Sequence, residues 1–147
     1  MRIKIAKYPF EAMVVFIWIG FVCAISFMEA WLKFRAPNVT LPIGLSIGRV
    51  VFSGLNKVEW ILAAVVIGTF VLRKARPSFF QLVFFSIPVA ILIIQTFFLL
   101  PILFDRVDII LSGQKPLPSY AHFYYVFLEV LKVVSLFVFG VFRFFPR

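Results

Sequence analysis

Seven polar or ionisable side chains stand inside the long apolar runs of this chain, where they could carry chemistry. They are Glu29, Arg49, Asn56, Glu59, Gln95, His122 and Glu129. Ionisable residues at membrane depth normally face a bundle interior or a wet cavity, with partners nearby. A carboxylate or an imidazole held there can take and release a proton or fix a polar ligand. We therefore expect these side chains to form one connected polar cluster.

Charged partners for three of these residues come from the same apolar runs. Glu29 is expected to pair with Lys33 or Arg49, and Glu129 with Lys132 or Arg49. Arg49 is thus expected to bind a carboxylate from another helix, Glu29 or Glu129 first, because a buried charge left alone is strongly destabilising.

Glu59 is the residue that best separates a structural role of the cluster from a functional one. Lys57 is close in sequence but points about 160° away around a helix, so it is a poor partner. If Arg49 or Lys132 reaches Glu59, the carboxylate belongs to a structural ion pair. Without a cationic partner, burial favours a carboxyl group that takes and releases a proton.

Metal and covalent chemistry find little support in the sequence. Carboxylate-bridged metals in four-helix bundles usually need Glu-x-x-His on two helices, and this chain has one histidine and no such motif. The available ligands are Glu29, Glu59, Glu129 and His122. No Ser-His-Asp or Cys-His arrangement and no phosphate-binding glycine loop is present. We expect neither a metal nor a cofactor, and the single cysteine, Cys23, excludes an intramolecular disulfide.

The elements that position these residues are membrane-spanning helices. Hydrophobic residues make up 63% of the 147 residues, charged residues 14%, and the mean hydropathy is +1.08, which a soluble core of this size cannot accommodate. Four apolar runs have bilayer-spanning length, at about residues 8–34, 42–72, 78–104 and 120–142. The sequence therefore predicts an all-α, four-span transmembrane helix bundle that forms a single integral membrane domain, residues 1–147.

The second run, 42–72, organises the chain because it is the most interrupted by polar residues. Its small and polar side chains recur at helical spacing, and the predicted inward face consists of Ser46, Arg49, Ser53, Asn56, Trp60 and Ala63.

The other three runs carry similar stripes. The predicted inward face of the first run consists of Glu11, Trp18, Ser26, Glu29 and Lys33. That of the third run consists of Gln81, Pro88, Leu92, Gln95 and Leu99. That of the fourth run consists of His122, Tyr125, Glu129, Lys132, Leu136 and Gly140. Pro88 is expected to kink the third helix. Residues 105–119 are expected to form the longest loop.

The net charge of +9 would suggest nucleic acid for a soluble domain, but here the basic residues flank apolar runs. We expect the lipid bilayer as partner and no nucleic acid. One side of the membrane would hold Arg2, Lys4, Lys7, Arg73, Lys74, Arg76, Arg143 and Arg147, and the other Lys33, Arg35, Arg106 and Lys115. The positive-inside rule then places both termini in the cytoplasm, in what we expect to be a bacterial inner membrane, and the polar cluster in the non-cytoplasmic half.

Two segments resemble a known class of membrane protein. FIWIGFxxAISFMEAWLKFxAP (16–37), followed by IGLSIGRVVF (43–52), resembles the small four-helix proteins of the transmembrane protein 205-like class. Arg106 and His122-x-x-Tyr125 are similar to the loop and the fourth-helix start of that class, although Ala36-Pro37 here follows the Leu-Lys-Phe element. Residues 54–59 are similar to DoxX-like four-helix proteins, the weaker alternative. Neither resemblance implies a particular reaction.

Three functions are compatible with this sequence. The first is a structural or accessory membrane protein, acting as a homo-oligomer or as a subunit of a membrane complex, and we favour it. The second is a transporter-like or ligand-binding protein that uses the polar cluster. The third is a membrane enzyme acting on a lipid or quinone, with Glu59, His122 and Glu129 as acid and base.

Overall fold

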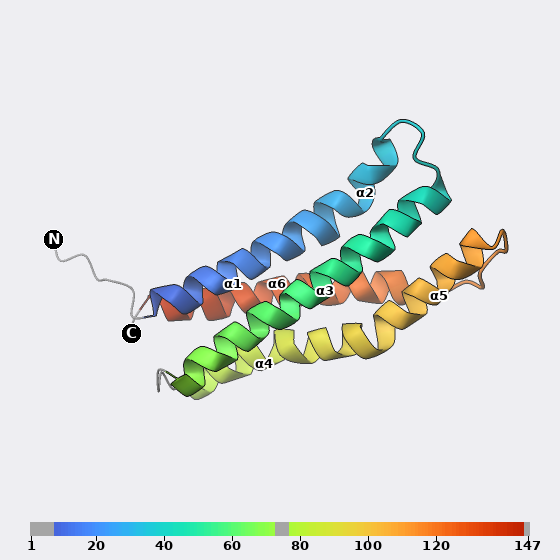
Figure 1. The fold of residues 1–147 in the computed structure, drawn as a ribbon. Coiled ribbons are helices and arrows are strands. Elements are labelled where there is room, and N and C mark those ends of the chain that lie inside the picture. Colours follow the sequence, from blue (N-terminus) through green and yellow to red (C-terminus); the bar gives the residue numbers. More distant parts are fainter. Residues whose placement is uncertain (1–7, 73–76, 146–147) are drawn as a thin grey trace.

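The computed structural model describes residues 8–72 and 77–145, which form four helical rods (Figure 1). The first rod contains α1 (Pro9–Val22), a π-helical segment η1 (Cys23–Glu29), α2 (Ala30–Leu32) and a short 3-10 turn η2 (Lys33–Arg35). The second is α3 (Leu41–Leu72). The third contains α4 (Phe79–Ile94), the π-helical segment η3 (Gln95–Leu99) and α5 (Leu100–Leu111), and the fourth is α6 (Ala121–Phe144).

Each rod is long and apolar enough to cross a membrane. The shortest, α6, has 24 residues, or about 36 Å at about 1.5 Å per residue, against a hydrocarbon thickness of about 30 Å. Large apolar side chains cover the outside of the bundle, including Val71, Phe79, Phe97 and Phe127. The prediction of an all-α bundle with four membrane-spanning helices is confirmed.

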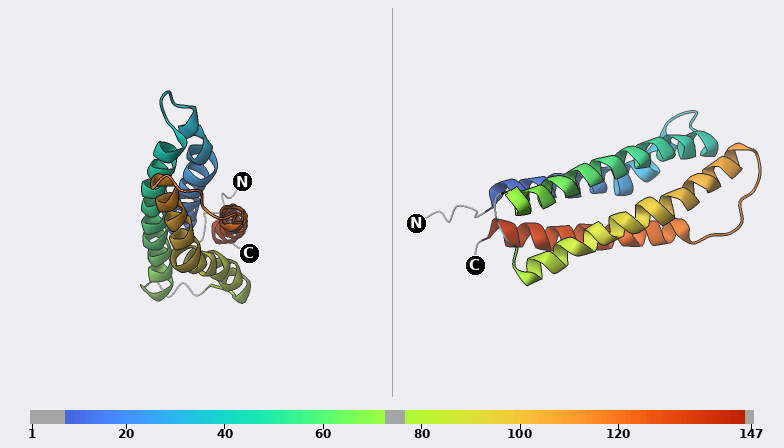
Figure 2. Two further views of the ribbon diagram at one scale, coloured as in Figure 1. Left: turned by 90° about the vertical axis from the view of Figure 1, so that its right-hand side faces the viewer. Right: turned by 60° about the horizontal axis from the view of Figure 1, so that its bottom comes forward.

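The rods pack antiparallel to their sequence neighbours (Figure 2). Helix α6 contacts both α1 and α4, while α3 contacts α1 and, through its first half, α5. The apolar core lies between the rods and includes Val15, Val22, Leu92 and Leu136. Toward the end where α1 begins and α6 ends, aromatic rings of Phe70, Phe85 and Phe139 pack against one another.

The third helix differs from the prediction in two ways. The α-helix continues through Pro88, and the change of geometry comes instead at η3, just before Pro101. Proline lacks the amide hydrogen and its ring displaces the carbonyl four residues earlier, which accounts for the irregular turn there. Figure 1 shows α5 inclined to α4.

The helix also extends to Leu111, so residues 105–111, predicted as loop, are helical. Gly113, at φ +81°, ends it in a Schellman motif: its N–H donates to the Ile110 carbonyl, and the Gln114 N–H donates to the Ile109 carbonyl.

The inward face of α3 matches the predicted one only at Ala63. Its buried residues are Gly44, Gly48, Leu55, Glu59, Ala63, Val66 and Thr69, whereas Ser46 is exposed and Asn56 and Trp60 are half-buried. Small residues allow close helix contact, and an added Cβ on Gly44 would lie 2.1 Å from the Phe34 ring. This close approach turns the Gly44 face inward and brings Glu59, rather than Asn56, to the interior.

Candidate functional site

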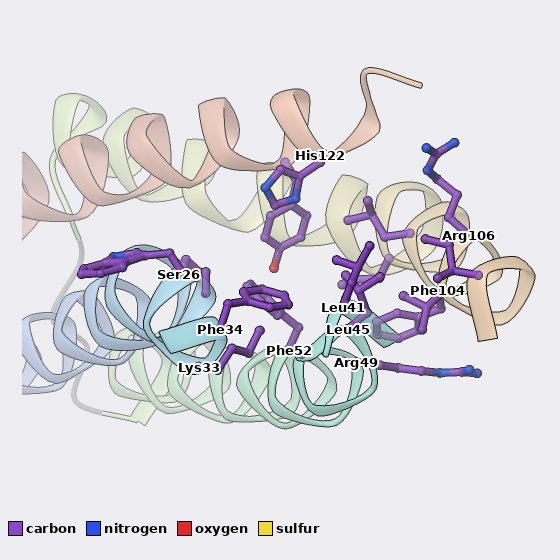
Figure 3. A pocket seen from close by; sticks show the side chains of 18 of the residues that line it. Ser26, Lys33, Phe34, Leu41, Leu45, Arg49, Phe52, Phe104, Arg106 and His122 are labelled. Atoms are coloured by element: carbon purple, nitrogen blue, oxygen red, sulfur yellow. The ribbon is translucent and has the colours of Figure 1, made fainter. Parts of the chain in front are cut away.

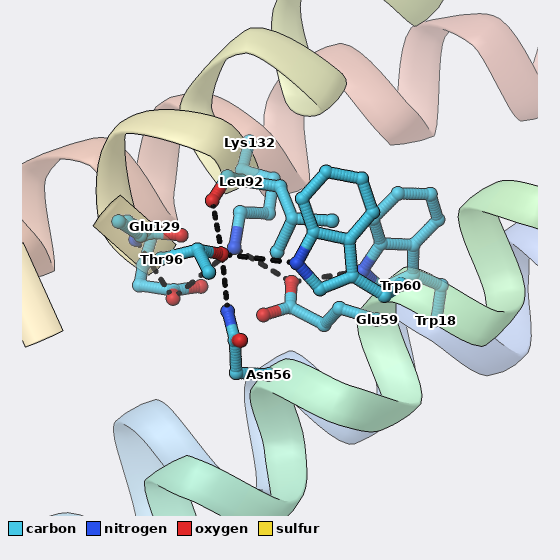
Figure 4. Close-up of polar contacts among 9 residues, drawn as sticks. Trp18, Asn56, Glu59, Trp60, Leu92, Thr96, Glu129 and Lys132 are labelled. Carbon is cyan, nitrogen blue, oxygen red and sulfur yellow. Dashed lines mark hydrogen bonds and ion pairs between the residues drawn. The ribbon is translucent and has the colours of Figure 1, made fainter.

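A polar cluster lies near the middle of the bundle and joins all four rods (Figure 4). We call the side chains of Trp18, Glu59, Gln95, Glu129 and Lys132 the central cluster. Lys132 Nζ lies 2.6 Å from Glu59 Oε1 and 3.3 Å from Glu129 Oε1. Trp18 Nε1 donates to Glu59 Oε1 at 2.9 Å, and Gln95 Nε2 donates to Glu129 Oε1 at 3.0 Å. All five side chains are fully buried.

Local sequence spacing explains how the central cluster forms. Glu129 and Lys132 are three residues apart on α6, so both lie on the face that packs against the other rods. Gln95 is the first residue of η3, and its buried amide reaches Glu129. Glu59 and Gln95 lie near the midpoints of their rods, so the central cluster occupies the middle of the bundle.

A second set of hydrogen bonds lies beside the central cluster and involves Asn56. Asn56 Nδ2 and Trp60 Nε1 both donate to Thr96 Oγ1, at 2.8 and 3.0 Å (Figure 4). The Thr96 hydroxyl in turn donates to the Leu92 carbonyl at 2.7 Å. These bonds link α3 to η3 and stabilise the irregular turn at η3.

The charges near the end of the first rod and the start of the second rod pair in two ways. Glu29 binds Lys33 at 3.2 Å, one of the two predicted pairings. Arg49 binds Asp108 of α5, so the expectation that it reaches Glu29 or Glu129 is wrong. Arg49 precedes Glu59 by ten residues, about 15 Å along the helix, too far from the central cluster. Asp108 was missed because its segment was predicted as loop.

A pocket of about 640 Å³ lies at the end of the bundle that holds α2 and α5 (Figure 3). Its apolar walls come from the first three rods and include Phe27, Trp31, Phe34, Leu41, Leu45, Phe52, Leu100, Leu103, Phe104, Val107 and Ile110. Its polar lining residues are Ser26, Lys33, Arg49, Arg106, His122 and Tyr125. In Figure 3 the side chains of Arg49 and Arg106 extend outward, whereas those of Phe34 and Phe52 lie within the pocket wall. The pocket is thus an apolar space with cations at its edge.

The seven predicted residues therefore do not form a single site. Glu59, Gln95 and Glu129 meet in the central cluster, and Asn56 lies beside it. Arg49 and His122 line the pocket. Glu29 binds Lys33, which also lines the pocket.

This separation bears on the metal and acid/base hypotheses. In residues 8–72 and 77–145, no three His, Cys, Asp or Glu side chains gather closely enough to hold a metal ion. His122 is exposed and lines the pocket, whereas Glu59 and Glu129 are buried in the central cluster, so the three do not meet as one acid/base set.

Sequence reasoning missed a second buried ion pair at the opposite end of the bundle. The sequence predicts Arg143 at the membrane surface, among the basic residues of one side. In the structure it is buried, and its Nε and Nη2 lie 2.8 Å and 2.5 Å from Glu11 Oε2. Its Nη1 also donates to Gln81 Oε1 at 3.3 Å. The sequence does place Glu11 and Gln81 on predicted inward faces, and this indicated that a buried partner was needed at that end of the bundle. The other seven basic residues assigned to that side lie outside the described residues.

Comparisons with family models, with curated proteins and with solved structures found no match. The resemblance to the transmembrane protein 205-like class therefore stays a prediction, and the function is argued from geometry alone.

Proposed function

We propose that this four-span membrane protein binds an anionic lipid, and that the pocket at the α2–α5 end is the binding site. The observation that carries the proposal is the combination of a 640 Å³ apolar pocket with Lys33, Arg49 and Arg106 at its lining. Small-molecule sites in proteins are mostly apolar clefts of about 300–1,000 Å³ with a few polar groups that fix orientation.

The charges around the pocket favour an anionic head group. All lining residues come from the segments 26–52 and 100–125. Together these segments contain five lysines and arginines but only three aspartates and glutamates. Lys33 and Arg49 each bind one carboxylate, and Arg106 donates to the Leu117 carbonyl. Guanidinium groups have five N–H donors and ammonium groups three, so donors remain for a phosphate.

The interior of the pocket favours an acyl chain with an ester group. Its walls carry aromatic and branched aliphatic side chains, which an acyl chain contacts without loss of hydrogen bonds. Ser26 also lines the pocket, and its Oγ is buried and has no hydrogen-bond partner within the described part of the chain. A buried hydroxyl of this kind fits a lipid ester carbonyl, which would accept its hydrogen bond.

A structural or accessory role is the second candidate, and the central cluster favours it. The Lys132–Glu59 ion pair joins α6 to α3 in a bundle whose other contacts are largely apolar. Buried ion pairs of this kind can fix the register of packed helices. On this view the protein would act as a homo-oligomer or as a subunit of a larger complex, without a ligand. In either case we propose the orientation with both termini in the cytoplasm of a bacterial inner membrane.

Native mass spectrometry distinguishes the two candidates. The protein would be released from nanodiscs that contain phosphatidylcholine and phosphatidylglycerol in equal amounts. We expect one retained phosphatidylglycerol per chain, lost in Leu45→Trp, which fills the pocket, and kept in Ile61→Trp, which lies on the exposed side of the same helix. Wild-type protein that retains no lipid, or both lipids equally, would count against the proposal.

A further inference from the structure

The central cluster contains more negative than positive charge if every group is ionised. Glu59 and Glu129 both contact Lys132, and all three side chains are fully buried. Within the residues that the structure describes, no second cation forms an ion pair with either carboxylate. A net buried charge in the middle of a membrane bundle is costly, because neither water nor lipid compensates it.

The groups that surround the two carboxylates do not correct the imbalance. Trp18 contributes from α1 and Gln95 from η3, and both are neutral donors. Tyr125 of α6 and Cys23 of η1 are the other titratable side chains that interact with Glu129, and either would add negative charge if it ionised. The buried pair Arg143–Glu11 is balanced within itself and lies near the start of α1.

The hydrogen bonds point to one missing donor. Every N–H group of the central cluster converges on the Oε1 atom of Glu59 or Glu129. Three buried acceptors, Glu59 Oε2, Glu129 Oε2 and Gln95 Oε1, accept no close hydrogen bond from the described residues, and the Tyr125 hydroxyl is a further donor that interacts with Glu129. A protonated carboxyl group supplies an O–H donor and removes one negative charge at the same time.

We propose that the central cluster is a proton-binding site, in which Glu129 carries one proton at neutral pH while Glu59 and Lys132 stay ionised. The distances separate the two carboxyl groups. Lys132 Nζ lies 2.6 Å from Glu59 but 3.3 Å from Glu129, while each carboxyl group accepts one further hydrogen bond, Glu59 from Trp18 and Glu129 from Gln95. Glu59 is therefore the counterion of Lys132, and Glu129 is the acid. Two carboxyl groups that share one cation commonly retain one proton between them.

This proton-binding site lies next to the lipid pocket but does not depend on it. Tyr125 lines the pocket and precedes Glu129 by one helical turn. A proton on Glu129 needs no ligand in the pocket, so the proposal stands or fails separately from lipid binding. Coupling of the two sites would make lipid binding sensitive to pH.

Infrared spectroscopy of the full chain in a detergent without ester groups, such as dodecyl maltoside, tests the proposal. A protonated carboxyl group gives a C=O stretching band above the amide I region, and the band shifts in D₂O. We expect this band at neutral pH in wild-type protein, its loss in Glu129→Gln, and its retention in the control Glu29→Gln, which removes a partly exposed carboxyl group outside the central cluster. A spectrum without the band, or a band that Glu129→Gln leaves unchanged, would overturn the proposal.

Thermal unfolding gives a second readout that does not depend on the spectrum. Because Gln resembles a protonated Glu in shape and charge, Glu129→Gln should change the melting temperature little. Glu59→Gln should lower it much more, since it removes the counterion of Lys132. If Glu129→Gln lowered the melting temperature as much as Glu59→Gln, Glu129 would be an ionised partner of Lys132 and the proposal would fail.

Discussion

Lys132 is the residue on which the interior of this protein depends most, because its ammonium group neutralises a carboxylate from another helix. It reaches Glu59 across the bundle and Glu129 on its own helix. Glu59 was a candidate for a proton site only if no cation reached it. Since Lys132 does, Glu59 is an ion-pair member, and the carboxyl group with the weaker contact is Glu129.

Replacement of Lys132 by methionine should strongly destabilise the protein. It would leave Glu59 with Trp18 as its remaining donor and no counterion. Removal of one partner of a buried ion pair typically costs about 3–5 kcal/mol. The free energy of unfolding, measured by denaturation in mixed detergent micelles, should fall by that order. The double variant Lys132→Met with Glu59→Gln should recover part of the loss, and additive losses would argue against the pair.

The sequence indicated some of the buried polar residues, such as Glu59, Gln95 and Glu129, but few of their partners. The Glu29–Lys33 contact was predictable because both residues belong to one helix at i, i+4 spacing. Arg49 and Lys132 were the two predicted partners of Glu59. Choosing Lys132 required knowledge of how α3 and α6 are shifted relative to each other along the bundle. Arg49–Asp108 and Arg143–Glu11 join residues far apart in sequence, and their spacing gives no periodic signal.

Among the helices, α3 shows how close packing fixes the position of polar groups. Its existence and length were predicted correctly, since 42–72 became Leu41–Leu72. Its inward face was predicted from polar residues, whereas Gly44 and Gly48 decide it by allowing Phe34 and Lys33 of η2 to approach. The π-helical segments η1 and η3 were not predictable, because they depend on neighbours that satisfy the altered backbone.

Gly44→Leu should separate α3 from the end of the first rod. Any side chain there collides with the Phe34 ring, while Gly54 on the same helix has open space around it. Overpacking typically costs about 1–3 kcal/mol of stability. Thermal unfolding in detergent should therefore show a lower melting temperature for Gly44→Leu than for wild type. Gly54→Leu is the matched control and should melt like wild type. Equal melting temperatures for all three proteins would contradict this role for Gly44.

Along the whole molecule, a buried ion pair lies at one end of the bundle, the central cluster lies in the middle, and the apolar pocket with cations at its edge lies at the other end. The end where α1 begins and α6 ends has the Arg143–Glu11–Gln81 contacts, and the other end has the pocket. The four-span architecture was predictable from the apolar runs, because bilayer thickness sets their length. The pocket was not, since it forms between helices whose tilts depend on packing along their whole length.

Orientation in the membrane can be measured on the intact molecule. The distribution of lysine and arginine predicts that Ser78 lies on the cytoplasmic side and Gly113 on the other. In a Cys23→Ala background, Ser78→Cys should be labelled by a membrane-impermeant maleimide only after cell lysis. Gly113→Cys should be labelled in intact cells. The reverse pattern would invert the orientation and place the pocket at the cytoplasmic surface.

The most direct test of lipid binding is photocrosslinking with a phosphatidylglycerol that carries a diazirine on one acyl chain. We expect labelled peptides to come mainly from residues 26–52 and 100–111, which line the pocket. Labelling there should decrease when unmodified phosphatidylglycerol competes and persist when phosphatidylcholine does. Label spread evenly over exposed apolar positions such as Val71, Phe79 and Phe127 would contradict a specific site.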